Sequence, residues 1–156
     1  MKLNVGDKAP DFHLPDQDGN MHTLKDYAGK WLLIYFYPKD STPGCTKEAC
    51  GLRDGMPDFG KLGMEVLGVS KDSEASHQKF IAKYDLNFSL LADTDTKMMQ
   101  AYDAWGEKSM FGNKYMGTMR NSYLIDPEGK IAKIYEKVKP AQHADQVMKD
   151  LQNLQA

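Results

Sequence analysis

The sequence predicts an α/β fold in which a central mixed β-sheet is flanked by helices on both faces. The first observation is an uninterrupted apolar run, residues 31–37, which is rich in aromatic side chains and typical of a strand buried on both faces. The second is the alternation of strand-like and helix-like segments, which predicts parallel strand pairs. The third is a strand, a tight turn and a strand near the C-terminus, which predict an antiparallel pair. The expected order is β-α-β-α-β-α-β-β-α.

The first half of the chain begins with an irregular arm and continues into the first long strand and helix. Prolines and the turn Asp18-Gly19-Asn20 predict an arm with a short hairpin. Pro38 ends the apolar strand, because proline has no amide hydrogen for the strand ladder. The expected elements are the arm with its hairpin, a strand over 31–37, a turn-rich loop over 39–44 and a helix from Cys45 to about Met56.

The second half contains four more strands and three more helices. Asp72 or Ser73 caps a helix whose Phe80, Ile81 and Tyr84 form one apolar stripe. The turn at residues 126–129 (DPEG) joins the last two strands as a hairpin. The expected elements are strands over 64–69, 88–91, 120–125 and 130–138, and helices over 73–84, 93–102 and 141–154.

The composition excludes several classes of protein. The 156 residues carry 20 Lys+Arg and 22 Asp+Glu, a net charge of −2, so no excess of charge favours nucleic acid or an anionic membrane as a partner. The longest apolar run is far shorter than the roughly 20 residues that cross a bilayer. We find no linker, repeat, low-complexity segment or secretory signal. We therefore expect a single domain over residues 1–156, located in the cytoplasm.

Two cysteines are too few for a disulfide scaffold, so the surroundings of each thiol are informative. Cys45 follows Pro43-Gly44 at the expected start of a helix, where unpaired amides and the helix dipole stabilise a thiolate. Ionising most of a thiol at neutral pH takes about 3 kcal/mol, whereas the dipole supplies about 1 kcal/mol. We therefore expect a cationic partner for Cys45 elsewhere in the chain.

Cys50 lies five residues after Cys45. On an α-helix this spacing places the two Cα atoms about 8.6 Å apart, whereas a disulfide needs about 4.4 to 6.8 Å. The thiols are therefore either unrelated, as small core side chains, or they pair only when the helix unwinds locally. The four histidines are scattered and show no zinc-type spacing, so we expect neither a metal nor another cofactor.

Residues 35–45 (YFYPKDSTPGC) resemble the active site of the peroxiredoxins, whose pattern is Pro-x-x-x-Thr/Ser-x-x-Cys. Pro38, Thr42 and Cys45 match this pattern, and Cys50 resembles the resolving cysteine of the bacterioferritin-comigratory, or Q-type, subgroup. Further matching segments are residues 6–12, 14–19, 51–54, 66–70, 105–108 and 120–126. The resemblance implies a thioredoxin-like fold and the thiol-dependent reduction of hydrogen peroxide or organic hydroperoxides to water or alcohols.

The resemblance also implies a role for each cysteine. Cys45 would attack a peroxide oxygen and become a sulfenic acid. Cys50 would then attack the sulfenic sulfur, form an intramolecular disulfide and release water. Because the two lie too far apart within an intact helix, we expect oxidation to unfold the start of that helix. A thioredoxin-like dithiol protein would reduce the exposed disulfide, and resolution within one chain favours a monomer.

Four further residues would complete the site that the resemblance implies. Thr42 would hold thiolate and peroxide through its hydroxyl, and Arg120 would be the expected cation, which also stabilises charge on the departing oxygen. Pro38 would shape the pocket and limit the access of water. Backbone amides of Gly44 and Cys45 would donate to the peroxide. From the residues alone, Pro38 could equally end the strand, Thr42 cap the helix and Arg120 pair with a surface carboxylate.

Other roles stay open on the sequence. Glu48, one turn after Cys45, either orients Arg120 or is a solvated helix residue. The methionine-rich stretch 110–119 is either an apolar collar that favours bulky hydroperoxides or ordinary loop packing. Two other functions compete with a peroxidase. One is a general disulfide oxidoreductase, which usually carries Cys-x-x-Cys, and the other is a redox-sensing or chaperone-like binding protein.

Overall fold

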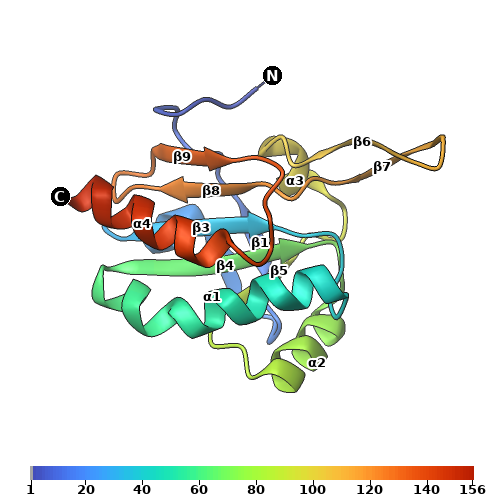
Figure 1. The fold of residues 1–156 in the computed structure, drawn as a ribbon, viewed down its shortest axis with the longest axis horizontal. Coiled ribbons are helices and arrows are strands. Elements are labelled where there is room, and N and C mark those ends of the chain that lie inside the picture. Colours follow the sequence, from blue (N-terminus) through green and yellow to red (C-terminus); the bar gives the residue numbers. More distant parts are fainter. Residues whose placement is uncertain (1) are drawn as a thin grey trace.

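The centre of the fold is a five-stranded mixed β-sheet in the order β5-β4-β3-β8-β9 (Figure 1). The structure is a computed structural model that describes residues 2–156, so Met1, the first residue of the expected domain, lies outside the described residues. The strands are β3 (Trp31–Phe36), β4 (Met64–Ser70), β5 (Ser89–Ala92), β8 (Ser122–Ile125) and β9 (Ile131–Tyr135). Strand β3 pairs in parallel with β4, and β4 with β5, whereas β8 and β9 are antiparallel. The expected mixed sheet is confirmed.

Strand β3 is buried on both faces, as its apolar sequence predicts. Leu33 and Tyr35 belong to the core on one face of the sheet, and Leu32 and Ile34 belong to the core on the other. All four are at most 1% exposed. Side chains alternate between faces along a strand, so a continuous apolar run supplies both cores at once.

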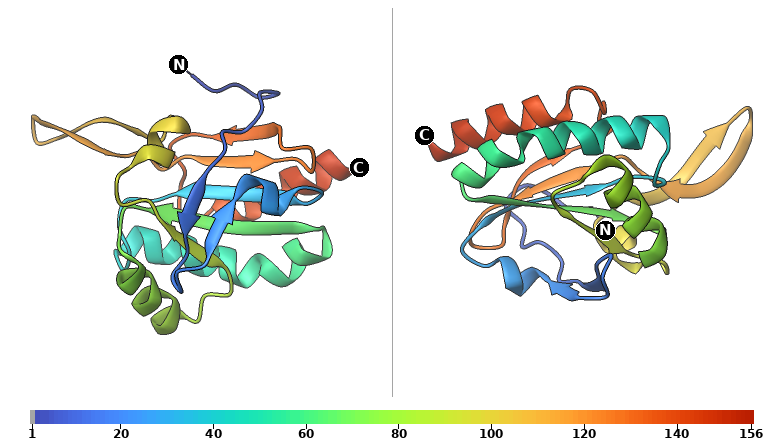
Figure 2. Two further views of the ribbon diagram at one scale, coloured as in Figure 1. Left: turned by 180° about the vertical axis from the view of Figure 1, so that it is seen from behind. Right: turned by 90° about the horizontal axis from the view of Figure 1, so that it is seen from below.

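Helices cover both faces of the sheet. Helix α1 (Pro43–Lys61) and helix α4 (His143–Gln155) lie side by side on one face (Figure 1), and α2 (Glu74–Tyr84) contributes to the same core. The other face carries α3 (Lys97–Ala101), the 3-10 helix η1 (Leu24–Tyr27) and the hairpin of β1 (His13–Pro15) and β2 (Met21–Thr23), as Figure 2 shows. The expected N-terminal hairpin and two-sided helical cover are therefore present.

Helix α1 extends to Lys61, five residues beyond the expected end at Met56, although it contains Pro57. A proline inside a helix leaves the carbonyl four residues earlier without its amide donor. That carbonyl belongs to Arg53, and the side-chain amide of Asn87 donates to it at 3.2 Å. A side chain from the α2–β5 connection thus replaces the missing bond. Asn87 is far from α1 along the chain, so this contact cannot be predicted from the local sequence. The expected helix is therefore too short.

A second difference is a long hairpin, β6 (Trp105–Met110) and β7 (Asn113–Thr118), where the sequence analysis expects no strands. It projects from the body of the molecule (Figures 1 and 2). Its two-residue tip is Phe111 and Gly112, with φ of 51° and 82°. Positive φ at both positions is the signature of the I′ turn that matches the twist of a hairpin. The sequence signal was therefore the glycine at the second tip position, flanked by two residue runs of equal length.

Element boundaries near the site also differ from the expected ones. The helix expected over 93–102 spans only Lys97–Ala101, because the buried Asp93 carboxylate accepts the amides of Met98 and Met99 and so holds the chain in a turn before the helix. The strand expected from Arg120 begins at Ser122. Arg120 therefore lies in the irregular segment just before β8.

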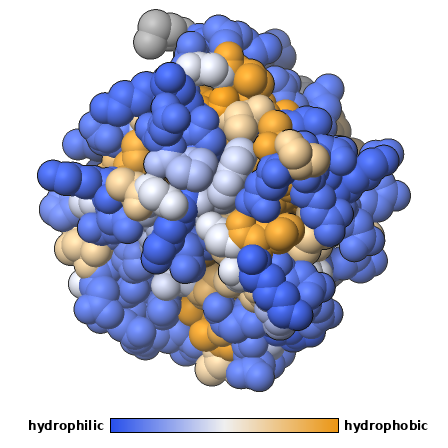
Figure 3. All heavy atoms as spheres, turned by 90° about the vertical axis from the view of Figure 1, so that its left-hand side faces the viewer, coloured by the Kyte–Doolittle hydropathy of each residue, from blue (hydrophilic) through white to orange (hydrophobic). Residues whose placement is uncertain are grey.

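Within residues 2–156, no helix is both long enough and apolar enough to span a bilayer. The end of the molecule shown in Figure 3 is mostly hydrophilic, with smaller apolar patches between the polar side chains.

Candidate active site

Cys45 lies at the N-terminus of α1, immediately after the loop that follows β3. Thr42 is the extended residue before the helix, Pro43 is its first residue, and the Thr46 amide closes the first turn on the Thr42 carbonyl at 2.8 Å. Proline suits the first helical position because its fixed φ is helical and its missing amide hydrogen is not needed there. Gly44 and Cys45 follow, so their amides have no acceptor within the helix. The Cys45 side chain is 1% exposed.

Arg120 brings its guanidinium to the sulfur of Cys45. Its Nη2 lies 3.1 Å from Cys45 Sγ, and its Nη1 lies 3.2 Å from Glu48 Oε1. The main chain of Arg120 is fixed between the sheet and the C-terminal segment, since its carbonyl accepts the Val138 amide and the next residue bonds to Phe36. A fixed cation at hydrogen-bonding distance stabilises the thiolate form of the cysteine.

Glu48 is a buried carboxyl on the same side of α1 as Cys45, with 1% of its side chain exposed. Its Oε1 accepts from Arg120, while its Oε2 has no hydrogen-bond partner among the described residues. Burial raises the pKa of Glu48 to about 7, although the guanidinium of Arg120 acts in the opposite direction. Glu48 is therefore not a solvated helix residue, and its charge changes near neutral pH.

The other expected site residues lie in the loop before Cys45 and at the start of α1, and Thr42 differs from expectation. The Thr42 hydroxyl donates to the carbonyl of Lys39 at 2.8 Å, so its hydrogen is engaged in the loop while its oxygen can still accept a bond. Pro38 is half-buried and lies two residues after the end of β3. A Cβ atom on Gly44 would lie 2.9 Å from Nη2 of Arg120. A glycine at this position therefore lets the guanidinium lie against the helix start.

Cys50 lies one and a half turns further along α1 and is half-buried, and both cysteines are free thiols. Helix α1 is continuous through both residues. Helical geometry therefore keeps their Cα atoms about 8.6 Å apart, which is beyond disulfide range. In this reduced form the two sulfurs cannot bond without local unwinding.

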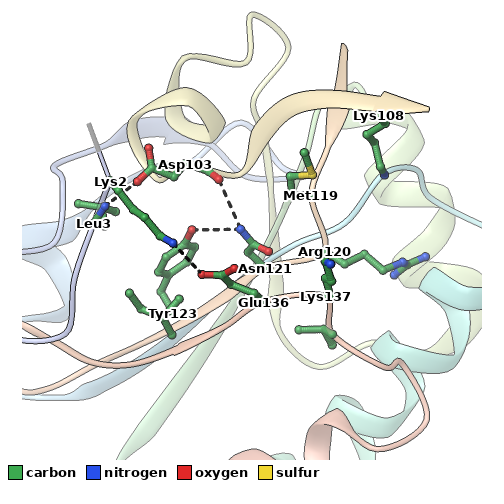
Figure 4. A pocket seen from close by; sticks show the side chains of 12 residues that line it. Lys2, Leu3, Asp103, Lys108, Met119, Arg120, Asn121, Tyr123, Glu136 and Lys137 are labelled. Carbon is green, nitrogen blue, oxygen red and sulfur yellow. Dashed lines mark hydrogen bonds and ion pairs between the residues drawn. The ribbon is translucent and has the colours of Figure 1, made fainter. Parts of the chain in front are cut away.

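A cavity of about 640 Å³ lies beside Arg120, but its lining does not include Cys45. In Figure 4 the guanidinium of Arg120 points away from Lys2 and Glu136, towards the start of a helix. In Figure 4, Met119 and Lys108 lie on the same side of this cavity as Arg120, away from Lys2 and Leu3. Of the three methionines in the stretch 110–119, only Met119 lies near Arg120, since Met110 and Met116 are exposed on the β6–β7 hairpin.

A buried polar cluster fixes the loop before Cys45, and sequence reasoning missed it. Asp40 Oδ2 lies 2.7 Å from His77 Nδ1, and the Tyr37 hydroxyl donates to the other carboxylate oxygen of Asp40. His77 Nε2 lies 2.9 Å from the Leu91 carbonyl, so the cluster ties the loop to α2 and β5. The available signal was the position of His77, three residues before Phe80 on the apolar stripe of its helix.

Among residues 2–156, no three His, Cys, Asp or Glu side chains lie close enough together to hold a metal ion.

Comparison with known proteins places this arrangement in context. The profile of the AhpC/TSA family matches residues 5–134. A putative peroxiredoxin Bcp of Coxiella burnetii is 49% identical over 148 residues, covering 95% of this chain and 98% of that protein. Peroxiredoxin Bcp of Escherichia coli K12 is 47% identical over 146 residues, covering 94% of each.

A solved structure shows the same similarity in three dimensions. The bacterioferritin comigratory protein of Xanthomonas campestris, studied for its alkyl peroxide reduction activity, superposes with a TM-score of 0.89 and 42% identity, covering 93% of this chain and 92% of that one. The expected thioredoxin-like α/β fold is thereby confirmed.

Proposed function

The chain belongs to the AhpC/TSA family of peroxiredoxins, in the branch of the Bcp and peroxiredoxin Q proteins, and from that premise we propose that it reduces hydroperoxides with Cys45 as the nucleophile. The observation that carries the assignment is the guanidinium of Arg120, 3.1 Å from Cys45 Sγ at the start of α1. This guanidinium supplies the positive charge that stabilises the Cys45 thiolate, because the helix dipole alone is too weak to do so.

The first step is attack of the Cys45 thiolate on one peroxide oxygen. The S–O bond forms as the O–O bond breaks, and the departing oxygen takes a proton to become water or an alcohol. Negative charge moves from sulfur to the departing oxygen, and the guanidinium of Arg120 is close enough to stabilise it in both places. Cys45 is left as a sulfenic acid.

The substrate would bind between the loop and the helix start. The free amides of Gly44 and Cys45 donate to the peroxide, the Thr42 oxygen accepts a hydrogen bond from it, and Pro38 limits the access of water. Cys45 is almost fully buried, so its sulfur is largely shielded from bulk solvent. The alkyl peroxide reduction of the Xanthomonas campestris relative supports organic hydroperoxides as substrates alongside hydrogen peroxide.

The second step would be resolution by Cys50 within the same chain. The first turns of α1 unwind, Cys50 attacks the sulfenic sulfur, and a thioredoxin-like dithiol reduces the disulfide. This route supports a monomeric peroxidase, because a second subunit contributes no residue. We also propose that the protein works in a reducing compartment, the cytoplasm, and the two free thiols support this.

The test is hydroperoxide consumption by the wild type, Cys45→Ser and Cys50→Ser with thioredoxin, thioredoxin reductase and NADPH. We expect turnover to be lost in both variants, while Cys50→Ser still forms one sulfenic acid per chain. Unchanged turnover in Cys50→Ser would make this a one-cysteine enzyme. Failure of wild-type Cys45 to react with peroxide would leave a thiol switch as the better explanation.

A further inference from the structure

Each of the two sulfurs faces its own arginine. Besides the contact between Arg120 and Cys45, Nη1 of Arg53 lies 3.6 Å from Cys50 Sγ. We propose that Arg53 is a further catalytic residue, which stabilises the thiolate of Cys50 and so prepares it to attack the sulfenic acid of Cys45. The proposal rests on the function proposed above, in which Cys50 resolves the sulfenic acid.

Arg53 is held in place from outside helix α1. Its Nη1 also donates to the Tyr84 carbonyl at 2.7 Å, at the end of α2. Its own carbonyl, left free by Pro57, accepts from the Asn87 side chain at 3.2 Å. Both ends of the residue are therefore tied to the α2–β5 connection. These bonds hold the guanidinium in its orientation towards Cys50, whereas an untethered arginine side chain on the surface would be mobile.

A guanidinium is always charged in proteins, and the other titratable groups around this pair are the carboxylates of Asp54 and Asp85 and the phenol of Tyr35. Asp54 on α1 bonds to Arg53 through Nε at 3.0 Å and Nη2 at 2.9 Å. This bond is the main cause of the raised pKa of Arg53, and Asp85 after α2 acts in the same direction. Tyr35 reaches this region from β3, and burial raises its pKa so far that it stays neutral. Arg53 is thus the cation that contacts Cys50 directly.

The chemistry of resolution requires a thiolate at Cys50. The Cys50 sulfur forms the S–S bond with Cys45 as the S–O bond of the sulfenic acid breaks, and hydroxide leaves and takes a proton to become water. A second peroxide competes for the same sulfenic acid and oxidises it to a sulfinic acid. A Cys50 that is already ionised when the helix opens attacks without waiting for deprotonation.

The first experiment measures Cys50 alone. In a Cys45→Ser background, the rate of alkylation of Cys50 by iodoacetamide is followed against pH for Arg53→Gln, Arg53→Lys and the control Lys61→Gln, which removes an exposed cation from the same helix. We expect Arg53→Gln to move the pH midpoint upward and to slow alkylation at neutral pH by about threefold. Arg53→Lys should restore much of the rate, and Lys61→Gln should match the parent. An identical midpoint in Arg53→Gln and the parent would overturn the proposal, because a purely structural Arg53 would change the rate but not its midpoint.

The second experiment uses both cysteines. After peroxide addition, disulfide formation and sulfinic acid yield are measured by mass spectrometry in the wild type and Arg53→Gln. We expect Arg53→Gln to form its sulfenic acid at the wild-type rate, to form the disulfide with a higher pH midpoint, and to accumulate more sulfinic acid. If the wild type forms no Cys45–Cys50 disulfide, the proposed function fails. If it does, and Arg53→Gln shows the same pH midpoint, only the role of Arg53 fails.

Discussion

The two halves of helix α1 are held by different interactions. Residues 43–50 carry both thiols and Glu48, and two arginines contact them: Arg120 bonds to Cys45 and Glu48, and Arg53 lies against Cys50. Residues 53–61 contain a proline, yet they are anchored by the Asn87 bond to the Arg53 carbonyl and by Phe59, which is fully buried. We expect the half with the better helix sequence to unwind during the proposed chemistry, and the half with the helix-breaking residue to stay in place.

Amide hydrogen exchange tests this comparison most directly. In the reduced protein, we expect the amides of both halves to be protected. In the disulfide form, the amides of residues 46–50 should lose protection by about two orders of magnitude or more, because no helix can bridge those two sulfurs. Residues 53–61 should change little. Equal protection from Cys45 to Gly55 in both forms would contradict the comparison, and Cys50→Ser treated with peroxide is the control that cannot form the disulfide.

Removal of the cation should have the largest effect on catalysis. We expect Arg120→Gln to lower the rate constant for reaction with peroxide by about two to three orders of magnitude, since it removes the donor to both the thiolate and the departing oxygen. Rapid-mixing kinetics under single-turnover conditions measure this step alone. Arg120→Lys keeps the charge but lacks the planar fork that bonds to Cys45 and Glu48 through separate nitrogens, so it should recover only part of the rate. A wild-type rate in Arg120→Gln would exclude its role.

Glu48 should make the first half of α1 less stable as pH rises. Its pKa is raised by burial to about 7, from 4.5 in the unfolded chain, so the folded state holds the proton more tightly. The stability that protonated Glu48 contributes is therefore fully present below its unfolded pKa of 4.5. It is lost as the pH rises through the folded pKa of about 7. Relative to Glu48→Gln, we expect the wild type to lose about 3 kcal/mol of unfolding free energy between acid and neutral pH. Denaturant unfolding at several pH values measures the difference, and parallel curves for the two proteins would contradict it.

Two glycines, one in each half of α1, provide a matched pair. A Cβ on Gly44 would lie 2.9 Å from Nη2 of Arg120, whereas one on Gly60 would have nothing within 4 Å. We expect Gly44→Ala to displace the guanidinium and slow the peroxide reaction about tenfold. Gly60→Ala should leave the rate unchanged and stabilise the helix by about 1 kcal/mol. Equal rates in the two variants would show that the guanidinium adjusts freely.

The smallest effect concerns the anchor of the second half. Asn87→Ala removes the donor to the Arg53 carbonyl, and we expect it to cost about 1 kcal/mol of unfolding free energy. Pro57→Ala returns a backbone amide to that carbonyl, so Asn87→Ala should cost less in the Pro57→Ala background. A double-mutant cycle measures this coupling, and strictly additive effects would show that the two residues act independently.

Much of the fold could be predicted because its signals are local. The apolar run of β3, the strand and helix alternation and the DPEG turn before β9 each act through neighbouring residues. The differences arise where distant side chains act. Asn87 carries α1 past Pro57, and the buried Asp93 carboxylate delays the start of α3. The β6–β7 hairpin depended on a turn whose only strong local signal is Gly112.

The sequence by itself determined the chemistry of the two thiols relative to each other. Cys45 at a helix start and Cys50 five residues later cannot form a disulfide within a helix, and this follows from helical rise and rotation alone. Only the tertiary structure decided what each sulfur contacts. Arg120 lies 75 residues after Cys45, and the orientation of Arg53 depends on the end of α2. Charge and burial act through space rather than along the chain, so these contacts and the altered pKa of Glu48 exist only in the folded molecule.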